Sequence, residues 1–139
     1  MPRFVVLWHQ TPPSSPRASH CDLMLEMGEV LWTWELPQWP PLCGTQAVRL
    51  PDHRRDYLQY EGPLTRARGS VRRLDQGTYE LLGGTHPRIV AQIAGQQHRG
   101  QLVLEELTAE ASSAAAAQRT WSVGWVEDTS SEPSEVGGT

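Results

Sequence analysis

The sequence has little cysteine and no long apolar runs, and each absence excludes a class of protein. The two cysteines, Cys21 and Cys43, are too few for a disulfide scaffold and lack the paired spacing of a structural zinc site. The apolar runs are far shorter than the roughly 18 residues of a membrane-spanning helix, and the N-terminus lacks a signal-peptide pattern. With 139 residues, the chain fits one domain. We therefore predict a cytoplasmic protein with reduced thiols and no membrane partner.

All 12 basic residues are arginine, and their distribution matters more than the formal net charge of −4. Four acids lie in the last thirteen residues, and the rest of the chain is neutral. Between residues 49 and 73, seven arginines face three acids, which gives this segment a local charge of +4. Guanidinium groups suit phosphate oxygens, so the segment fits a nucleic-acid partner. A solvated surface explains the same charges equally well.

Apolar residues recur with a period of two in short runs bounded by Gly, Pro and Asp, which is typical of strands. Met27-Gly28 and Asp75-Gln76-Gly77 lie between such runs and predict hairpin turns. The sequence therefore predicts an all-β, mainly antiparallel fold, a small closed or partly open β-barrel with long loops and little helix. The candidate strands are 3–9, 20–27, 29–36, 45–50, 69–75, 78–82, 88–94, 99–107 and 119–126.

Three segments, Gln10–Ser19, Pro37–Gly44 and the Ala-rich Ala109–Gln118, are predicted to be irregular, with a helical turn at most in the third. The domain is predicted to span residues 1–126. Residues 127–139 are rich in Ser, Gly and acids and are predicted to form a disordered tail.

A candidate metal site lies in the second predicted strand. Strand alternation puts His20 and Asp22 on one face and Leu23 and Leu25 on the other, which is a core face. His9 ends the first strand and supplies a third ligand if the two strands are neighbours. Two imidazoles and one carboxylate suit a divalent metal such as Mn²⁺ or Zn²⁺. On spacing alone, His-x-Asp fits ordinary polar residues on a solvent-facing strand as well.

A second polar cluster, residues 52–57, places a histidine, a tyrosine and two arginines within six positions. Such a set can contact a phosphate and protonate a leaving group, and it is equally typical of a charged turn. Trp32 and Trp34 share a strand face, which favours a core role over base stacking. His86 and His98 have the surroundings of loop residues without a catalytic role.

Several short motifs occur in a fixed order from Arg3 to Val126. This order resembles the 3′-phosphoesterase domain of bacterial DNA ligase D. The resemblance covers nearly the whole chain apart from its tail, and the fourth block is the most specific. The blocks are Arg3-Phe4-Val5-Val6 with His9, His20-x-Asp22-x-x-x-Glu26, Gly28-x-Val30-Leu31-x-x-Trp34-x-Leu36-Pro37, Asp52-His53-x-x-Asp56-Tyr57-x-x-Tyr60-Glu61-Gly62, Gly77-Thr78-Tyr79-Glu80 and Arg99-Gly100-x-Leu102-x-Leu104.

The resemblance implies a manganese-dependent enzyme that removes 3′-terminal ribonucleosides and 3′-phosphates from DNA ends, with Zn²⁺ as the alternative metal. DNA or RNA-containing DNA 3′ ends would be the partner, and a ligase or polymerase would act in trans. By this resemblance His9, His20 and Asp22 hold the metal, and His53 and Tyr57 contact the reacting phosphate as catalytic residues. The arginines expected to bind phosphate or nucleic acid are Arg17, Arg54, Arg55, Arg66 and Arg68.

Two positions depart from the family pattern. Met24 stands where the family has arginine, and Gln38 stands where it has lysine. Each lost phosphate-directed cation can cost a few kcal/mol of transition-state stabilisation. The loop between His9 and His20 is also about five residues longer than the family's. The alternative function is therefore a catalytically weakened homologue that serves as a nucleic-acid or protein interaction module.

Overall fold

The computed structural model describes residues 1–83, 87–107 and 119–128. These residues form nine strands and one short 3-10 helix, η1. None of them belongs to a helix that is long and apolar enough to cross a membrane. The elements are β1 (Arg3–Gln10), β2 (His20–Met27), β3 (Val30–Leu36), β4 (Thr45–Arg54), η1 (Arg55–Leu58), β5 (Gly62–Pro63), β6 (Ser70–Gly83), β7 (Arg88–Gly95), β8 (Arg99–Glu106) and β9 (Arg119–Glu127).

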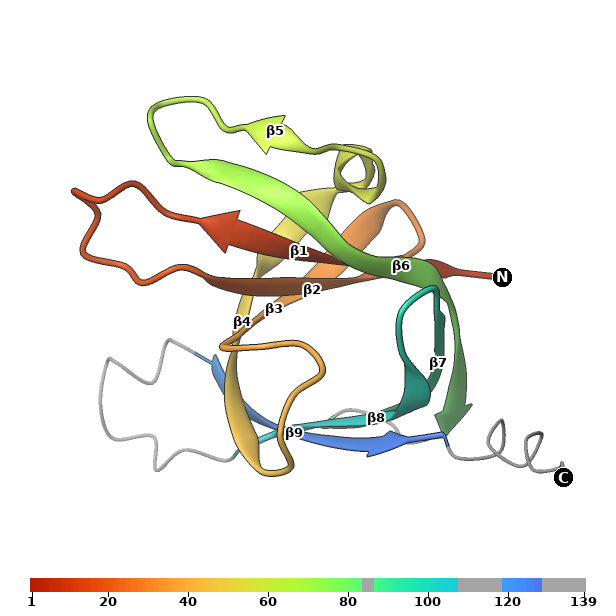
Figure 1. Ribbon diagram of the computed structural model, residues 1–139. Coiled ribbons are helices and arrows are strands. Elements are labelled where there is room, and N and C mark those ends of the chain that lie inside the picture. The colour runs from red at the N-terminus through yellow and green to blue at the C-terminus, as the bar shows by residue number, and fades with distance from the viewer. Residues whose placement is uncertain (84–86, 108–118, 129–139) are drawn as a thin grey trace, which may run out of the picture.

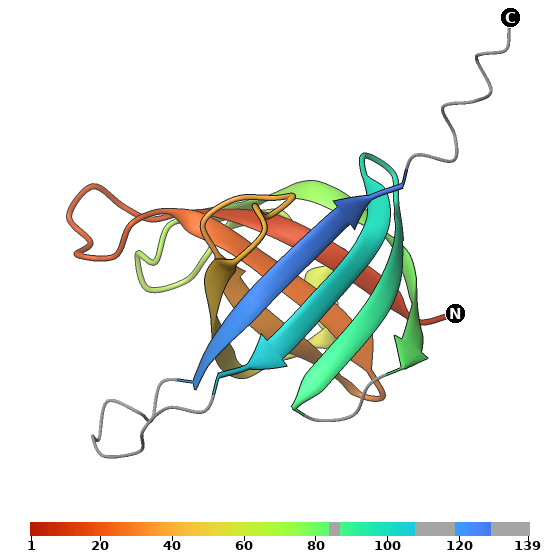
Figure 2. The ribbon, with the colours of Figure 1, turned by 90° about the horizontal axis from the view of Figure 1, so that it is seen from below.

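The nine strands form one antiparallel sheet in the order β1-β2-β3-β4-β9-β8-β7-β6-β5. Because β6 also pairs with β1, the sheet closes in a ring (Figure 1). Seen from below, β9 and β8 cross in front of β1 and β2 on the far side of the ring (Figure 2). The predicted all-β, antiparallel fold class is thus confirmed.

The strands bury side chains on both faces of the sheet near β1 and β2. Phe4 and Leu23 belong to the main core, together with residues from β3, β6, β7, β8 and β9. Val5, Leu7 and Met24 point the opposite way and join a smaller apolar cluster with Leu31, Leu58 and Val71, which we call the outer cluster. β2 is therefore buried on both faces, and its outer face carries His20 and Asp22 beside Met24.

The predicted hairpin at Met27-Gly28 is confirmed, with Met27 opposite Val30 and Gly28 at a φ of 66°. The predicted irregular segments 10–19 and 37–44 also carry no strand beyond Gln10. The predicted Ala-rich insert, His86 and the tail beyond Asp128 lie outside the described residues.

The predicted turn at Asp75-Gln76-Gly77 is wrong, because β6 continues through these residues without interruption. Asp75 is buried, with 2% of its surface exposed, and its carboxylate accepts the backbone N–H groups of Gln97 and His98 at 2.9 and 3.1 Å. It therefore holds the turn between β7 and β8 rather than a turn of its own. At Gly77 the backbone passes so close to Ala94 that an added Cβ would lie 2.1 Å from its carbonyl oxygen. Glycine is needed here for close strand approach.

Glu26, near the end of β2, links the start of β1 to η1. One carboxylate oxygen accepts the Arg3 backbone N–H at 2.9 Å, and the other accepts the Arg55 guanidinium at 2.6 and 3.1 Å. Burial by itself would raise the pKa of Glu26, but the hydrogen bonds from Arg3 and Arg55 outweigh it and hold the pKa below its ordinary value of 4.5.

We expect Glu26→Gln to lower the free energy of unfolding at neutral pH by about 1–3 kcal/mol, because the amide cannot make charge-assisted hydrogen bonds. The pKa of Glu26 is lower in the folded than in the unfolded chain. Its stabilisation is therefore fully present above the unfolded-state pKa and is lost as the pH falls through the folded-state pKa.

Urea unfolding of parent and variant between about pH 3 and pH 7 measures both effects. The difference between them should shrink in acid. Glu80→Gln, a change to an exposed carboxylate on β6, is the control and should match the parent. Equal stability of parent and Glu26→Gln at neutral pH would contradict the prediction.

Candidate active site

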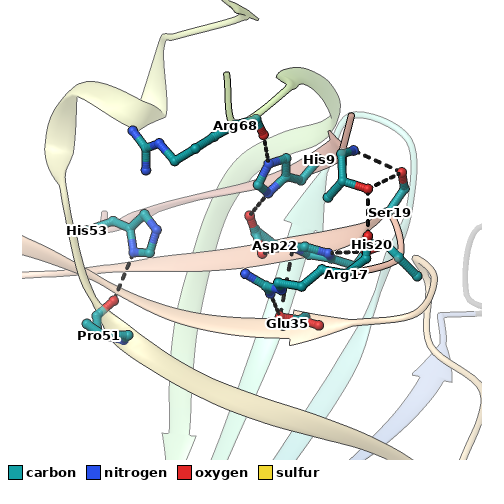
Figure 3. Close-up of polar contacts among 11 residues, drawn as sticks. His9, Arg17, Ser19, His20, Asp22, Glu35, Pro51, His53 and Arg68 are labelled. Atoms are coloured by element: carbon teal, nitrogen blue, oxygen red, sulfur yellow. Dashed lines mark hydrogen bonds and ion pairs between the residues drawn. The ribbon is translucent and has the colours of Figure 1, made fainter. Parts of the chain in front are cut away.

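His9, His20 and Asp22 converge at one end of the β1–β2 pair. His9 lies directly opposite His20 in the strand register, and Asp22 follows two residues later on the same face. Asp22 Oδ2 lies 3.8 Å from His9 Nδ1, and Asp22 Oδ1 lies 3.4 Å from His20 Nε2. One ligand atom from each residue lies within 4.8 Å of the others. The structure thus brings the predicted trio together (Figure 3).

Backbone carbonyls fix the orientation of both imidazoles. His20 Nδ1 lies 2.9 Å from the Ala18 carbonyl oxygen, and His9 Nε2 lies 2.8 Å from that of Arg68. A carbonyl oxygen only accepts, so these two nitrogens carry the protons, and the other nitrogen of each neutral ring keeps its lone pair facing Asp22. His20 Nε2 and Asp22 Oδ1 are buried without a hydrogen-bond partner among the described residues. This donor set fits a divalent cation, with the tautomers set as in protein metal sites.

The electrostatics of the trio also favour positive charge. Burial would lower the pKa of His20, but Asp22, the Ala18 carbonyl and Glu35 outweigh it, so the pKa of His20 is raised. Glu35 Oε1 lies 3.9 Å from His20 Nε2. Sequence reasoning missed Glu35, although the two-residue turn at 28–29 fixes a register that places it opposite Asp22.

The trio lines a cavity of about 490 Å³, which we call the main cavity. His53 also lines it, and its Nδ1 lies 2.9 Å from the Pro51 carbonyl oxygen, which leaves Nε2 of the neutral ring without a proton. Two predicted phosphate-binding residues, Arg17 and Arg68, also line the main cavity.

The two arginines reach the main cavity from loops. Thr11 donates a hydrogen bond at 2.8 Å to the Arg17 backbone carbonyl, and the Arg17 guanidinium pairs with Glu35. The Arg68 guanidinium donates to the backbone and side-chain oxygens of Thr65 at 3.0 and 3.2 Å. In Figure 3 the Arg68 side chain extends from the His9 side of the site toward His53. Positive charge therefore borders both sides of the trio.

The remaining predicted site residues lie elsewhere. Tyr57 and Arg54 line a neighbouring cavity of about 240 Å³, which we call the side cavity, and Arg68 lines both cavities. Arg55 pairs with Glu26, near the opposite end of β2 from His20. Arg66 lies in the loop before β6 with a φ of 60° and lines neither cavity.

The two family departures contribute no side chain to the main cavity. Met24 is only 1% exposed and packs in the outer cluster. Gln38 is exposed, and its amide donates to the Pro40 carbonyl at 3.3 Å. An arginine at position 24 would need the apolar neighbours of Met24 to give way to a charged group and its partners.

The sequence of residues 13–123 matches the family model described as DNA Ligase D 3'-phosphoesterase domain. A search of curated proteins found no match to the chain. The family match covers most of the chain and includes His20, Asp22 and His53, and membership of this family indicates a phosphoesterase that processes DNA ends. Together with the antiparallel ring, it establishes that the chain belongs to the DNA ligase D 3'-phosphoesterase domain family.

Proposed function

We propose that the protein is a metal-dependent phosphoesterase that removes a 3′-phosphate or a 3′-ribonucleoside from DNA ends. The observation that carries this proposal is the convergence of His9, His20 and Asp22 in a cavity that also contains His53 and two arginines. A cation site, a proton carrier and phosphate-directed guanidinium groups are the parts that phosphoester hydrolysis requires. Residues 1–126 would form this unit.

His9 Nδ1, His20 Nε2 and a carboxylate oxygen of Asp22 would hold the metal. The nitrogen-rich set suits Zn²⁺, and a mixed set of imidazole and carboxylate also suits the Mn²⁺ expected from the family resemblance. When bound, the cation would polarise a phosphoryl oxygen and activate water.

The side chains of the main cavity divide the remaining work. The Arg17 and Arg68 guanidinium groups orient the phosphate oxygens from opposite sides. Nε2 of His53 faces no fixed protein donor in the described structure and carries a proton to or from the reacting oxygen. Tyr57 lines the side cavity, and its ring packs edge to face against the His53 imidazole with the centroids 5.5 Å apart. This contact fixes the orientation of the imidazole.

The 3′-hydroxyl that such a reaction leaves is the substrate of end joining and extension. A ligase or polymerase acting in trans would therefore use the product.

A second candidate function is a weakened homologue that binds DNA or a protein partner. It is favoured by the burial of Met24 in the outer cluster and by the exposed, locally bonded Gln38, since neither position supplies a cation to the main cavity. In this alternative, the loop arginines bind phosphate without driving turnover.

His20→Ala should abolish stoichiometric metal binding and lower 3′-phosphatase activity by at least roughly 100-fold, because a ligand with a fixed tautomer is lost. Calorimetric titration with Mn²⁺ and Zn²⁺, and release of phosphate from a 3′-phosphorylated primer-template, measure the two effects. His98→Ala is the matched control, since this histidine lies beside Glu127 and outside the trio. Defined metal binding that survives in His20→Ala would remove the proposed site.

Arg17→Ala and Arg68→Ala should each reduce turnover by roughly 10²-fold, the effect of removing one donor to a developing phosphoryl charge. Steady-state kinetics on the same primer-template measures this. Arg88→Ala, an exposed arginine at the start of β7, is the control. The Arg68 variant keeps the backbone carbonyl that orients His9. A parent protein that binds metal and DNA without turnover would instead establish the weakened homologue.

A further inference from the structure

The chemistry above places no part of the substrate in the side cavity. It lies next to the main cavity, because Arg68 lines both, and it has a different character. Its lining includes the rings of Tyr57 and Tyr60, the apolar side chain of Leu64, and the charged Arg54 and Asp56. At about 240 Å³ it falls below the roughly 300 Å³ at which pockets for drug-sized ligands begin. Its occupant is therefore small.

A row of aromatic rings joins the two cavities. The ring centroids of His53 and Tyr57 lie 5.5 Å apart, and those of Tyr57 and Tyr60 lie 6.1 Å apart, both edge to face. His53 lines the main cavity, whereas the two tyrosines line the side cavity. A nucleic-acid strand whose terminal phosphate enters the main cavity would thus have aromatic rings beside the base that adjoins this phosphate.

The protein holds these rings in place before any ligand binds. Tyr57 is half-buried and packs against the outer cluster. Tyr60 keeps 37% of its surface exposed, and its hydroxyl donates a hydrogen bond to the carbonyl of Pro63 in β5. A fixed, partly exposed ring loses little conformational entropy on stacking.

The side cavity carries charges of both signs beside its aromatic rings. Arg54 and Arg68 are positive, but the Asp56 carboxylate opposes a doubly charged group in the same space. A nucleobase is planar and uncharged, stacks on aromatic rings regardless of its sequence, and accepts cation–π contact from arginine.

We propose that the side cavity binds one unpaired nucleobase, that of the nucleotide adjoining the phosphate in the main cavity. This inference rests on the proposed function for the position of the phosphate. A base reaches a cavity lined by Tyr57, Tyr60 and Leu64 only after it leaves its stack and its pair. The protein would therefore act on frayed or single-stranded 3′ ends in preference to fully paired ones.

Fluorescence anisotropy of the full chain tests this inference in chelator, where no metal-dependent turnover occurs. The probes are two single-stranded, 3′-phosphorylated oligonucleotides that differ only in the last nucleotide, which carries thymine in one and is abasic in the other. The parent should bind the thymine end about 5- to 150-fold more tightly, the range expected for one base stacked on aromatic side chains.

Tyr60→Ala should lose this preference and bind both ends alike. Tyr60→Phe is the matched control, because it keeps the ring and loses only the hydroxyl group that bonds to Pro63. This variant should retain the preference for the thymine end. Pairing the thymine end in a blunt duplex should weaken binding. The proposal is overturned if the parent binds thymine and abasic ends equally, binds neither, prefers the paired end, or if Tyr60→Ala keeps the preference.

The parent comparison requires no variant, so a folding defect in Tyr60→Ala leaves the test intact. It also separates this inference from the proposed function. A parent that prefers the thymine end but releases no phosphate with Mn²⁺ contradicts only the proposed phosphoesterase function. An active parent that is indifferent to the base contradicts only the side-cavity site.

Discussion

The double pairing of β1 is the constraint on which both the fold and the site depend. One edge of β1 pairs with β2 and the other with β6, and this second pairing closes the ring. The same strand places His9 opposite His20 and, on its other side, opposite Val71 at the start of β6, just after the loop whose Arg68 carbonyl orients the His9 ring. Closure of the sheet and orientation of a candidate ligand thus come from one strand.

The outer face of β2 combines packing with candidate chemistry. The interior face of β2 packs in the main core through Leu23. The outer face of β2 carries His20 and Asp22 and, two residues further along, the apolar Met24. Packing of Met24 in the outer cluster, two residues from Asp22, stabilises the position of the trio. A ligand site supported in this way keeps its geometry because its strand cannot move without disturbing two cores.

Local pattern was sufficient for much of this structure. Period-two alternation predicted the strands and placed His20 and Asp22 on one face, and the two-residue turn after Met27 fixed a register that also contains Glu35. Asp75 shows where local pattern fails: Asp-Gln-Gly is typical of a turn, and its real role depends on Gln97 and His98, more than twenty residues away. The side cavity was missed for another reason. Its walls all lie within residues 54–68, but the path of the chain through η1 and β5, which strand alternation does not predict, brings them together.

The placement of the cations has a further consequence for the proposed enzyme. In the main cavity the positive side chains, Arg17 and Arg68, come from loops, whereas the family positions now occupied by Met24 and Gln38 lie on or just after strands. Loop side chains keep more freedom than strand side chains, so ordering them against a phosphate costs entropy. The Arg17–Glu35 ion pair and the Thr65 bonds to Arg68 offset part of this cost in advance. In the proposed enzyme, such preorganisation would help a cavity whose cations come from loops to bind a phosphate.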